Sequence, residues 1–287
     1  MKKYTYYSRI RKRRILFKRL RFAGILLCAA LLVFGGVKLF GHFRGEASPA
    51  FSEQPEVTAE PSPEISPSPS PVPYSPDRLN GIYQQDGKKI AYLTFDDGPS
   101  KGVTEGVLDV LKQYGIKATF FTLGSQVQKH PELVKRQKEE GHVVGNHGFS
   151  HQYKEIYASN ECFTADLDQA EAQLKEILGN DYMKFYRFPG GGYQKSKAPF
   201  KEILNAREYY YLDWNCLTDD SMGSYDAGYL KNRLIETAQG KEKLVILMHD
   251  AAAKKTTVEA LGPIIEYLKG QGYQFATLQD FIEKKIY

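Results

Sequence analysis

Four short segments of the sequence combine carboxylates, imidazoles and a guanidinium, the side chains that bind metals and transfer protons. The segments are LTFDDGPS (93–100), NHGFSH (146–151), YRFPGG (186–191) and LMHD (247–250). They contain six candidate functional residues: Asp96, Asp97, His147, His151, Arg187 and His249. Each segment lies where an apolar, β-rich run ends, and in a parallel α/β barrel the strand ends meet on the face that carries the chemistry. The pattern predicts a metal site with acid–base groups beside it.

Asp96 and Asp97 are adjacent at the end of the first such run. Neighbouring residues of a strand point to opposite sides, so one carboxylate can bind a metal while the other accepts a proton from water. Asp-Gly-Pro favours a sharp turn, and Ser100 is a good N-cap for the helix expected next. Taken alone, the motif is equally well explained as a turn before a helix.

His147 and His151 are four residues apart, a spacing that on a helical turn places both imidazoles on one side. Two histidines and one carboxylate suit zinc, which lowers the pKa of a bound water to about 7. Non-haem iron uses the same ligand set, so the three residues alone do not choose between hydrolysis and oxygenation. The alternative is two histidines on a solvated loop.

Three further polar residues follow predicted strands. His249 ends the apolar run KLVILM and can protonate a leaving group, or it is a strand-end histidine bonded to the backbone. Arg187 can hold a carboxylate with two hydrogen bonds, or it lies at the surface. Asp220, in the loop after EYYYLDWN, can pair with either group or is an ordinary loop aspartate.

Short apolar runs alternate with helical stretches from about residue 88 onward. Strands are expected at 89–95, 117–123, 142–146, 184–189, 208–214, 243–248 and 273–278. Helices are expected near 103–114, 131–140, 161–178, 197–206, 226–238, 256–270 and 279–286. This alternation predicts a parallel sheet, and seven repeats predict an α/β fold in the form of a distorted seven-stranded (β/α) barrel. An open doubly wound sheet is the alternative, although RFPGGG (187–192) lacks the dinucleotide-binding spacing.

The N-terminal part has a different composition. Residues 1–21 carry ten Lys or Arg and no acid, and residues 22–37 carry no charge. We expect a basic cytoplasmic tail at 1–21 and a transmembrane signal-anchor at 22–40, which places the rest of the chain outside the cell membrane. A cleaved signal peptide is the alternative. Residues 41–80, rich in Pro and Ser, predict a disordered linker before a catalytic domain at 86–287.

Charge and cysteines narrow the classes of partner. Ten of the 39 Lys and Arg lie in the tail, which has no acid. Residues 22–287 therefore contain 29 Lys and Arg and 34 Asp and Glu, a net charge of −5. We therefore expect membrane contact through the N-terminal helix but neither nucleic acid nor a protein partner. Cys28 lies in the apolar run, and Cys162 and Cys216 are expected to be two separate small core residues.

On these four motifs, the sequence resembles the polysaccharide deacetylase family (NodB-homology domain, carbohydrate esterase family 4) over about residues 86–281. The resemblance implies that Asp96 is the general base, and that Asp97, His147 and His151 bind a divalent metal. Zinc is expected first, with cobalt, nickel, manganese or iron as alternatives.

RFPGG and LMHD resemble two further motifs of the family. They imply that Arg187 holds the base and that His249 is the general acid, beside an acetyl pocket that includes Leu247. Gly190 stands where the family often has a tyrosine, so a backbone N–H is expected to bind the oxyanion there. Asp220 aligns with the aspartate that polarises the acid, and Trp214 is a further substrate-binding candidate.

The resemblance and the predicted export imply removal of N-acetyl groups from a cell-wall polysaccharide, with peptidoglycan N-acetylglucosamine as the first candidate. Poly-N-acetylglucosamine, chitooligosaccharide and acetylxylan are alternative substrates. A catalytically inactive wall-binding module is an alternative of another class, and an iron-dependent oxygenase is a third.

Overall fold

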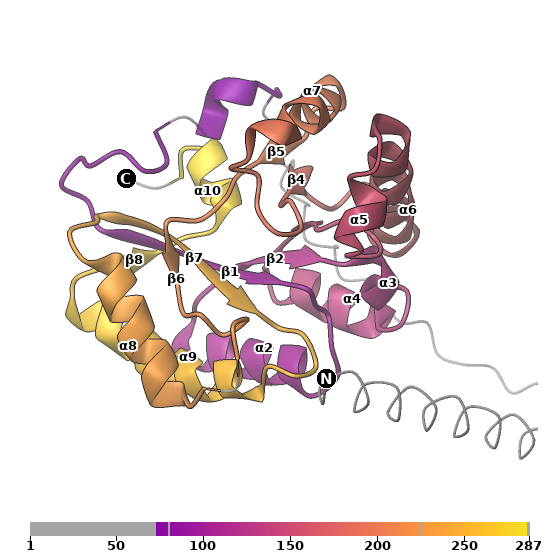
Figure 1. The fold of residues 1–287 in the computed structure, drawn as a ribbon. Coiled ribbons are helices and arrows are strands. Elements are labelled where there is room, and N and C mark those ends of the chain that lie inside the picture. The colour runs from indigo at the N-terminus through magenta and orange to yellow at the C-terminus, as the bar shows by residue number, and fades with distance from the viewer. Residues whose placement is uncertain (1–72, 80, 224, 286–287) are drawn as a thin grey trace, which may run out of the picture. The chain divides into compact units, whose positions relative to one another are not determined.

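The computed structural model describes residues 73–79, 81–223 and 225–285 (Figure 1). The predicted tail at 1–21, the predicted anchor at 22–40 and the predicted linker up to residue 72 lie outside these residues. Among the helices of the described part, none is long and apolar enough to cross a membrane.

The described residues contain one parallel sheet. Its strands are β1 (Ile90–Asp96), β2 (Thr119–Thr122), β3 (Val143–Asn146), β4 (Phe185–Tyr186), β5 (Tyr210–Tyr211), β6 (Cys216–Leu217), β7 (Lys243–His249) and β8 (Gln274–Phe275). The order is β5-β4-β3-β2-β1-β7-β6, and β8 pairs with the start of β1. Each of the seven predicted strands overlaps one of these strands, so the predicted parallel sheet is confirmed.

The two ends of the seven-strand path, β5 and β6, are neighbours in the chain. Only residues 212–215 separate them, and a chain from Tyr211 to Cys216 spans at most about 18 Å. The sheet must therefore curl until its edges come near each other, as a distorted barrel requires. The sequence predicted one strand over 208–214. In the structure β5 covers only Tyr210–Tyr211 of this range, and β6, which lies just beyond it, was missed.

Helices connect the strands and cover the outside of the sheet (Figure 1). They are α2 (Val103–Tyr114), α3 (Gly124–Val127), α4 (Pro131–Glu139), α5 (Tyr153–Ile156), α6 (Asn160–Leu178), α7 (Ala198–Ala206), α8 (Ala227–Ala238), α9 (Lys255–Gly270) and α10 (Leu278–Ile282). The seven predicted helices correspond to α2, α4 and α6–α10. The four-residue helices α3 and α5 were not predicted, because one turn is too short to show a helical period.

The hydrophobic core has two main parts on opposite faces of the sheet. Along β7, Leu244, Ile246 and Met248 pack with α2, α8 and α9. Val245, on the other face, packs with Tyr92 and Phe121. Because side chains of a strand alternate between faces, Leu247 and His249 share the face of Val245. The face that carries the candidate site is thus the inner one.

Two predictions about local structure were wrong. Ser100 is not the N-cap of α2: Gly102 precedes this helix, and the Ser100 hydroxyl donates instead to the carbonyl oxygen of Asp250. Cys162 is exposed in the first turn of α6, whereas Cys216 is buried as expected, and both are free thiols.

The folded part begins before residue 86. Residues Pro76–Leu79, within the predicted linker, form the 3-10 helix η1. Just before it, the Tyr74 hydroxyl donates to Asn205 on α7, and the Ser75 amide donates to the hydroxyl of Tyr210. These contacts tie the segment to the β5 edge of the sheet.

Candidate active site

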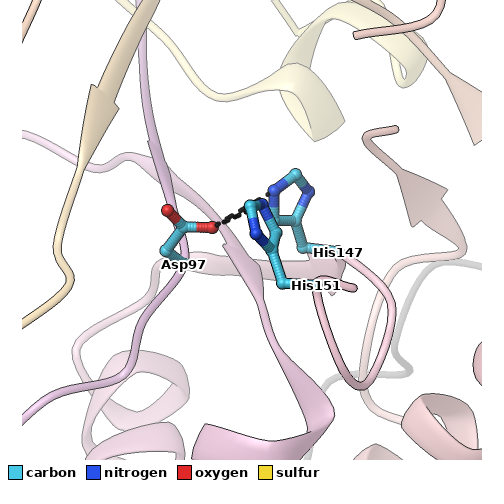
Figure 2. A group of neighbouring side chains, drawn as sticks. All are labelled: Asp97, His147 and His151. Atoms are coloured by element: carbon cyan, nitrogen blue, oxygen red, sulfur yellow. Dashed lines mark ion pairs between the residues drawn. The ribbon is translucent and has the colours of Figure 1, made fainter. Parts of the chain in front are cut away.

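Asp97, His147 and His151 lie together where β1 and β3 end (Figure 2). Asp97 Oδ1 is 3.4 Å from His147 Nε2 and 3.2 Å from His151 Nε2. One ligand atom from each of the three residues lies within 4.8 Å of the others. The structure thus brings together the three predicted metal ligands.

The loop that carries the two histidines is not helical, so the predicted helical turn is wrong. His151 has a φ of 59° and Gly148 a φ of 79°, so both residues adopt a left-handed backbone conformation that a right-handed helical turn excludes. The carboxylate of Asp166 on α6 fixes this loop by accepting hydrogen bonds from the amides of Phe149 and Ser150, at 2.8 and 3.0 Å. Tertiary contacts, rather than a helical repeat, place both Nε2 atoms beside Asp97.

The hydrogen bonding of His147 determines its tautomer. Its Nδ1 lies 2.8 Å from the carbonyl oxygen of Arg187. A carbonyl can only accept, so Nδ1 carries a proton, and in the neutral ring Nε2 offers its lone pair on the side of Asp97. A second partner that orients the ring in this way is typical of metal-binding histidines.

The three residues fit a divalent metal. Asp97 Oδ1 is buried and has no hydrogen-bond partner among the described residues, and the lone pair of His147 Nε2 points toward it. Burial alone would raise the pKa of Asp97, but His147, His151 and His249 lower it well below its usual range. A buried carboxylate beside two imidazoles favours positive charge between them, which a proton or a bound cation can supply, and two histidines with one carboxylate are a common set of zinc ligands.

Asp96 is buried at the end of β1 and pairs with Arg187. Arg187 Nη1 donates to Asp96 Oδ1 at 3.0 Å and to the Thr94 hydroxyl at 2.5 Å. The guanidinium has no solvent exposure and lies over the ring of Phe121, 4.2 Å from its centroid. Asp96 Oδ2 is 4.0 Å from His147 Nε2. Arg187 therefore holds the Asp96 side chain beside the predicted metal position, where a base is needed.

His249 and Asp220 form a second buried pair. His249 ends β7 directly beside Asp96 in the sheet register. Asp220 accepts from His249 twice, with Oδ1 2.8 Å from the ring Nδ1 and Oδ2 2.7 Å from the backbone amide. Thr257 donates to Asp220 Oδ2 at 2.9 Å. The structure thus places Asp220 at the predicted acid, with its carboxylate oriented by three donors.

This pairing sets the charge of His249. Burial disfavours the imidazolium, but the hydrogen bond and the negative charge of Asp220 outweigh it and raise the pKa of His249 to about 9. Because a carboxylate accepts at Nδ1, the proton on Nε2 is the one that can be donated toward the site. A histidine protonated at neutral pH can act as a general acid.

The predicted substrate-binding residues lie in three different settings. Leu247 is nearly buried on the inner face of β7, two residues before His249. Gly190 is exposed with φ 75, and its N–H donates no hydrogen bond to any described residue. Trp214 lies under Arg187, with its ring centroid 5.9 Å from the guanidinium carbon, and lines a cavity of about 420 Å³ with Tyr83 and Tyr193.

Sequence reasoning missed three residues that shape the site. Asp250 is buried and accepts from Thr104 at 2.7 Å, and its backbone amide donates to the carbonyl of Asp96. A side chain on Gly98 would overlap the Asp250 carboxyl, which explains the glycine. Asp166 fixes the histidine loop, and Tyr153 contacts His151. Asp250 could have been found, because it follows His249 in LMHD. Nothing in the sequence around Asp166 and Tyr153 indicates their roles.

Comparison with known proteins agrees with this geometry. The family model for polysaccharide deacetylase matches residues 83–209. Peptidoglycan-N-acetylglucosamine deacetylase of Bacillus cereus is 34% identical, over 70% of this chain and 72% of its own length. Peptidoglycan-N-acetylglucosamine deacetylase PgdA of Listeria monocytogenes is 36% identical over 69% of this chain, but the match spans 40% of the length of that protein.

Solved structures give the same result. The catalytic domain of peptidoglycan N-acetylglucosamine deacetylase from Eubacterium rectale matches with a TM-score of 0.62 and 35% identity, over 68% of this chain and 90% of that one. A CE4 esterase of Streptococcus mutans matches with a TM-score of 0.64 and 30% identity, over 71% and 91%. The fold and the site define an α/β-barrel hydrolase, and the chain belongs to the polysaccharide deacetylase family.

Proposed function

We propose that this protein is a metal-dependent hydrolase that removes N-acetyl groups from peptidoglycan N-acetylglucosamine. One observation carries the proposal: an Asp-His-His cluster lies beside a buried carboxylate held by Arg187, and a histidine held by Asp220 is the sheet neighbour of that carboxylate. Hydrolysis of an amide needs a proton acceptor for water and a proton donor for the amine, and the two pairs supply one of each.

Asp97, His147 and His151 would hold the metal. A divalent metal bound there would polarise the acetyl carbonyl and lower the pKa of a water molecule. Zinc is the first choice because its common sites combine imidazole nitrogen with carboxylate oxygen. Cobalt, nickel, manganese and iron accept the same donors.

The protein's own residues carry the proton transfers. Asp96, held in place by Arg187, accepts a proton from water as the water oxygen bonds to the acetyl carbon. The N–H of Gly190, free among the described residues, donates to the carbonyl oxygen as negative charge develops there. His249 then gives its Nε2 proton to the amide nitrogen as the C–N bond breaks. The products are acetate and a glucosamine unit.

The names of relatives support the choice of substrate, since proteins of Listeria, Bacillus and Eubacterium similar to this chain are named peptidoglycan N-acetylglucosamine deacetylases. We also propose that the N-terminal segment anchors the protein in the cell membrane with the catalytic domain on the wall side. Ten cations before an uncharged run support this orientation. N-terminal sequencing of the membrane fraction tests it: a mature chain that starts after about residue 41 would indicate cleavage instead.

Acetate release from purified peptidoglycan, poly-N-acetylglucosamine, an N-acetylglucosamine pentamer and acetylxylan tests the proposed function. We expect release from peptidoglycan at the highest kcat/KM, loss after chelation, and recovery when zinc is added. Asp97→Ala is the matched inactive control, because it removes one predicted ligand. Release from acetylxylan alone would contradict the substrate, and release that survives complete metal removal would contradict the mechanism.

A further inference from the structure

The aromatic ring of Tyr153 lies beside the candidate metal cluster. Tyr153 begins α5, two residues after His151, and its ring centroid lies 4.9 Å from that of His151, tilted by 57°. Although it touches a predicted ligand, Tyr153 is 48% exposed. Among the large exposed side chains of the described residues, it alone makes a ring contact with the Asp97–His147–His151 cluster.

The same ring covers Gly190, which comes from a distant part of the chain. A Cβ built on Gly190 would lie 3.4 Å from Cε2 and Cζ of Tyr153 and 3.6 Å from its hydroxyl oxygen. Gly190 also has φ 75, a conformation that L side chains rarely adopt. The backbone conformation therefore explains the glycine, and the Tyr153 ring lies within van der Waals reach of the position that a Cβ would take.

Tyr153 and His249 come from separate strands of the sheet. His249 ends β7 and Tyr153 follows β3, so β1 and β2 lie between their strands. The Tyr153 ring lies beside both the predicted ligand His151 and the candidate oxyanion donor Gly190. A group bound to both of these residues would lie close to this ring.

A half-exposed tyrosine at this place has the properties of a sugar-binding surface. Its ring offers a rigid apolar face at a low entropy cost, and its hydroxyl makes no hydrogen bond to the described residues, so it is free for a ligand. Ligand sites combine such aromatic walls with a few polar groups that fix orientation. The hexose rings of a polysaccharide present both apolar C–H faces and hydroxyls.

We infer that Tyr153 is a substrate-positioning residue, whose ring packs against a sugar of the bound glycan while the acetyl group reaches the metal cluster. The inference rests on the proposed function. It predicts that Tyr153 governs recognition of the glycan and not of the acetyl group. Removing the ring should therefore weaken binding of a glycan while leaving the chemistry on a small acetyl ester unchanged.

The experiment compares Tyr153→Ala, Tyr153→Phe and wild type, with Glu155→Ala as a matched control on the exposed side of the same short helix. Substrates are an N-acetylglucosamine pentamer and 4-nitrophenyl acetate, which has no sugar ring. For Tyr153→Ala we expect KM for the pentamer to rise about tenfold, the effect of a stacked aromatic contact of about 1.4 kcal/mol. Its kcat, its rate on the small ester and its metal content should stay near wild type. Tyr153→Phe should keep most of the affinity.

Calorimetric binding of the pentamer to metal-free protein provides a readout that does not depend on turnover. We expect about tenfold weaker binding in Tyr153→Ala and no change in Glu155→Ala. An unchanged pentamer KM in an active Tyr153→Ala enzyme overturns the inference alone. Equal losses on pentamer, ester and metal content also overturn it, because they mean that the ring only supports His151. If the wild-type protein releases no acetate, the proposed function is wrong. In that case the binding measurement still tests the inference on Tyr153: equal pentamer affinity in Tyr153→Ala and wild type would reject it.

Discussion

The pairing of His249 with Asp220 can be tested by changing the charge without changing the shape. Asp220→Asn keeps a carbonyl oxygen that can accept from His249 Nδ1 but removes the negative charge. Its amide nitrogen replaces the oxygen that accepts from the His249 amide and from Thr257, a loss that does not depend on pH. The side chains of Asp220 and His249 are 1% and 12% exposed, so solvent screens the interaction little. The variant therefore measures how much of the raised pKa comes from the carboxylate charge.

The magnitude follows from the pKa of His249. A rise from 6.5 to about 9 corresponds to about 3 kcal/mol at 1.36 kcal/mol per pH unit. Hydrogen bonds to an ionised group are roughly twice as strong as neutral ones. Removing the charge of Asp220 should therefore remove about half of the 3 kcal/mol that stabilises protonated His249. We expect Asp220→Asn to lower the pKa of His249 by about one pH unit or more.

Stability should show the same linkage with a defined sign. The folded-state pKa of His249 is raised, so its stabilising effect is complete below pH 6.5 and is lost as the pH rises through about 9. Asp220→Asn should therefore lower the free energy of unfolding by about 1.5 kcal/mol at pH 6. The difference from wild type should shrink above pH 9.

The assay is an NMR titration of the histidines in metal-free protein, with the His249 signal assigned from His249→Gln. Urea unfolding at pH 6 and near pH 10 gives the stability difference. In the metal-loaded enzyme, the alkaline limb of kcat/KM should move to lower pH in Asp220→Asn, because less His249 is protonated.

Asp219→Asn is the matched control. Asp219 is adjacent in the chain but pairs with Arg233 and makes no contact with His249. It should leave the His249 pKa unchanged. An unchanged pKa in Asp220→Asn, or an equal shift in both variants, would refute the assignment of Asp220 as the group that polarises the acid.

Three further changes separate the roles of the other residues. Asp97→Ala should lose metal and acetate release together, whereas Asp96→Asn should keep its metal and lose about 10²–10⁴ in kcat; elemental analysis showing the opposite pattern would exchange the two roles. Arg187→Met leaves Asp96 buried without its partner and should cost about 3–5 kcal/mol of unfolding free energy in urea, and an unaltered midpoint would argue against this pair. Gly98→Ala pushes a methyl group against Asp250, so we expect a lower melting temperature and weaker metal retention. Wild-type values of both would mean that the turn relaxes and that the contact does not constrain residue 98.

The sequence alone identified the strands, the helices and the candidate functional residues that follow the strands, because each of these shows as a local pattern of residues. Alternating strands and helices predicted the parallel barrel, because burial on both faces makes parallel strands continuous apolar runs. The chemistry-bearing residues follow these runs directly, so the ends of the strands placed Asp96, Asp97 and His249 on one face. Local pattern also led to errors where it was ambiguous. The run at 208–214 predicted one strand, and the short strand β6 that follows it was missed. The spacing of His147 and His151 suggested a helical turn where the structure has a loop.

The pairs Arg187–Asp96 and Asp220–His249 were implied by the family resemblance, but only the tertiary structure shows their contacts. Arg187 and Asp96 are 91 residues apart, and Asp220 and His249 are 29 apart, so no repeat or spacing links their positions in the chain. Tyr153 and Gly190 likewise meet only because β3 and β4 are neighbours in the sheet. The physical reason is that strands and helices form through local periodicity, which a sequence displays. A pKa, a tautomer or the wall of a pocket depends on contacts between segments, which exist only after the sheet has closed.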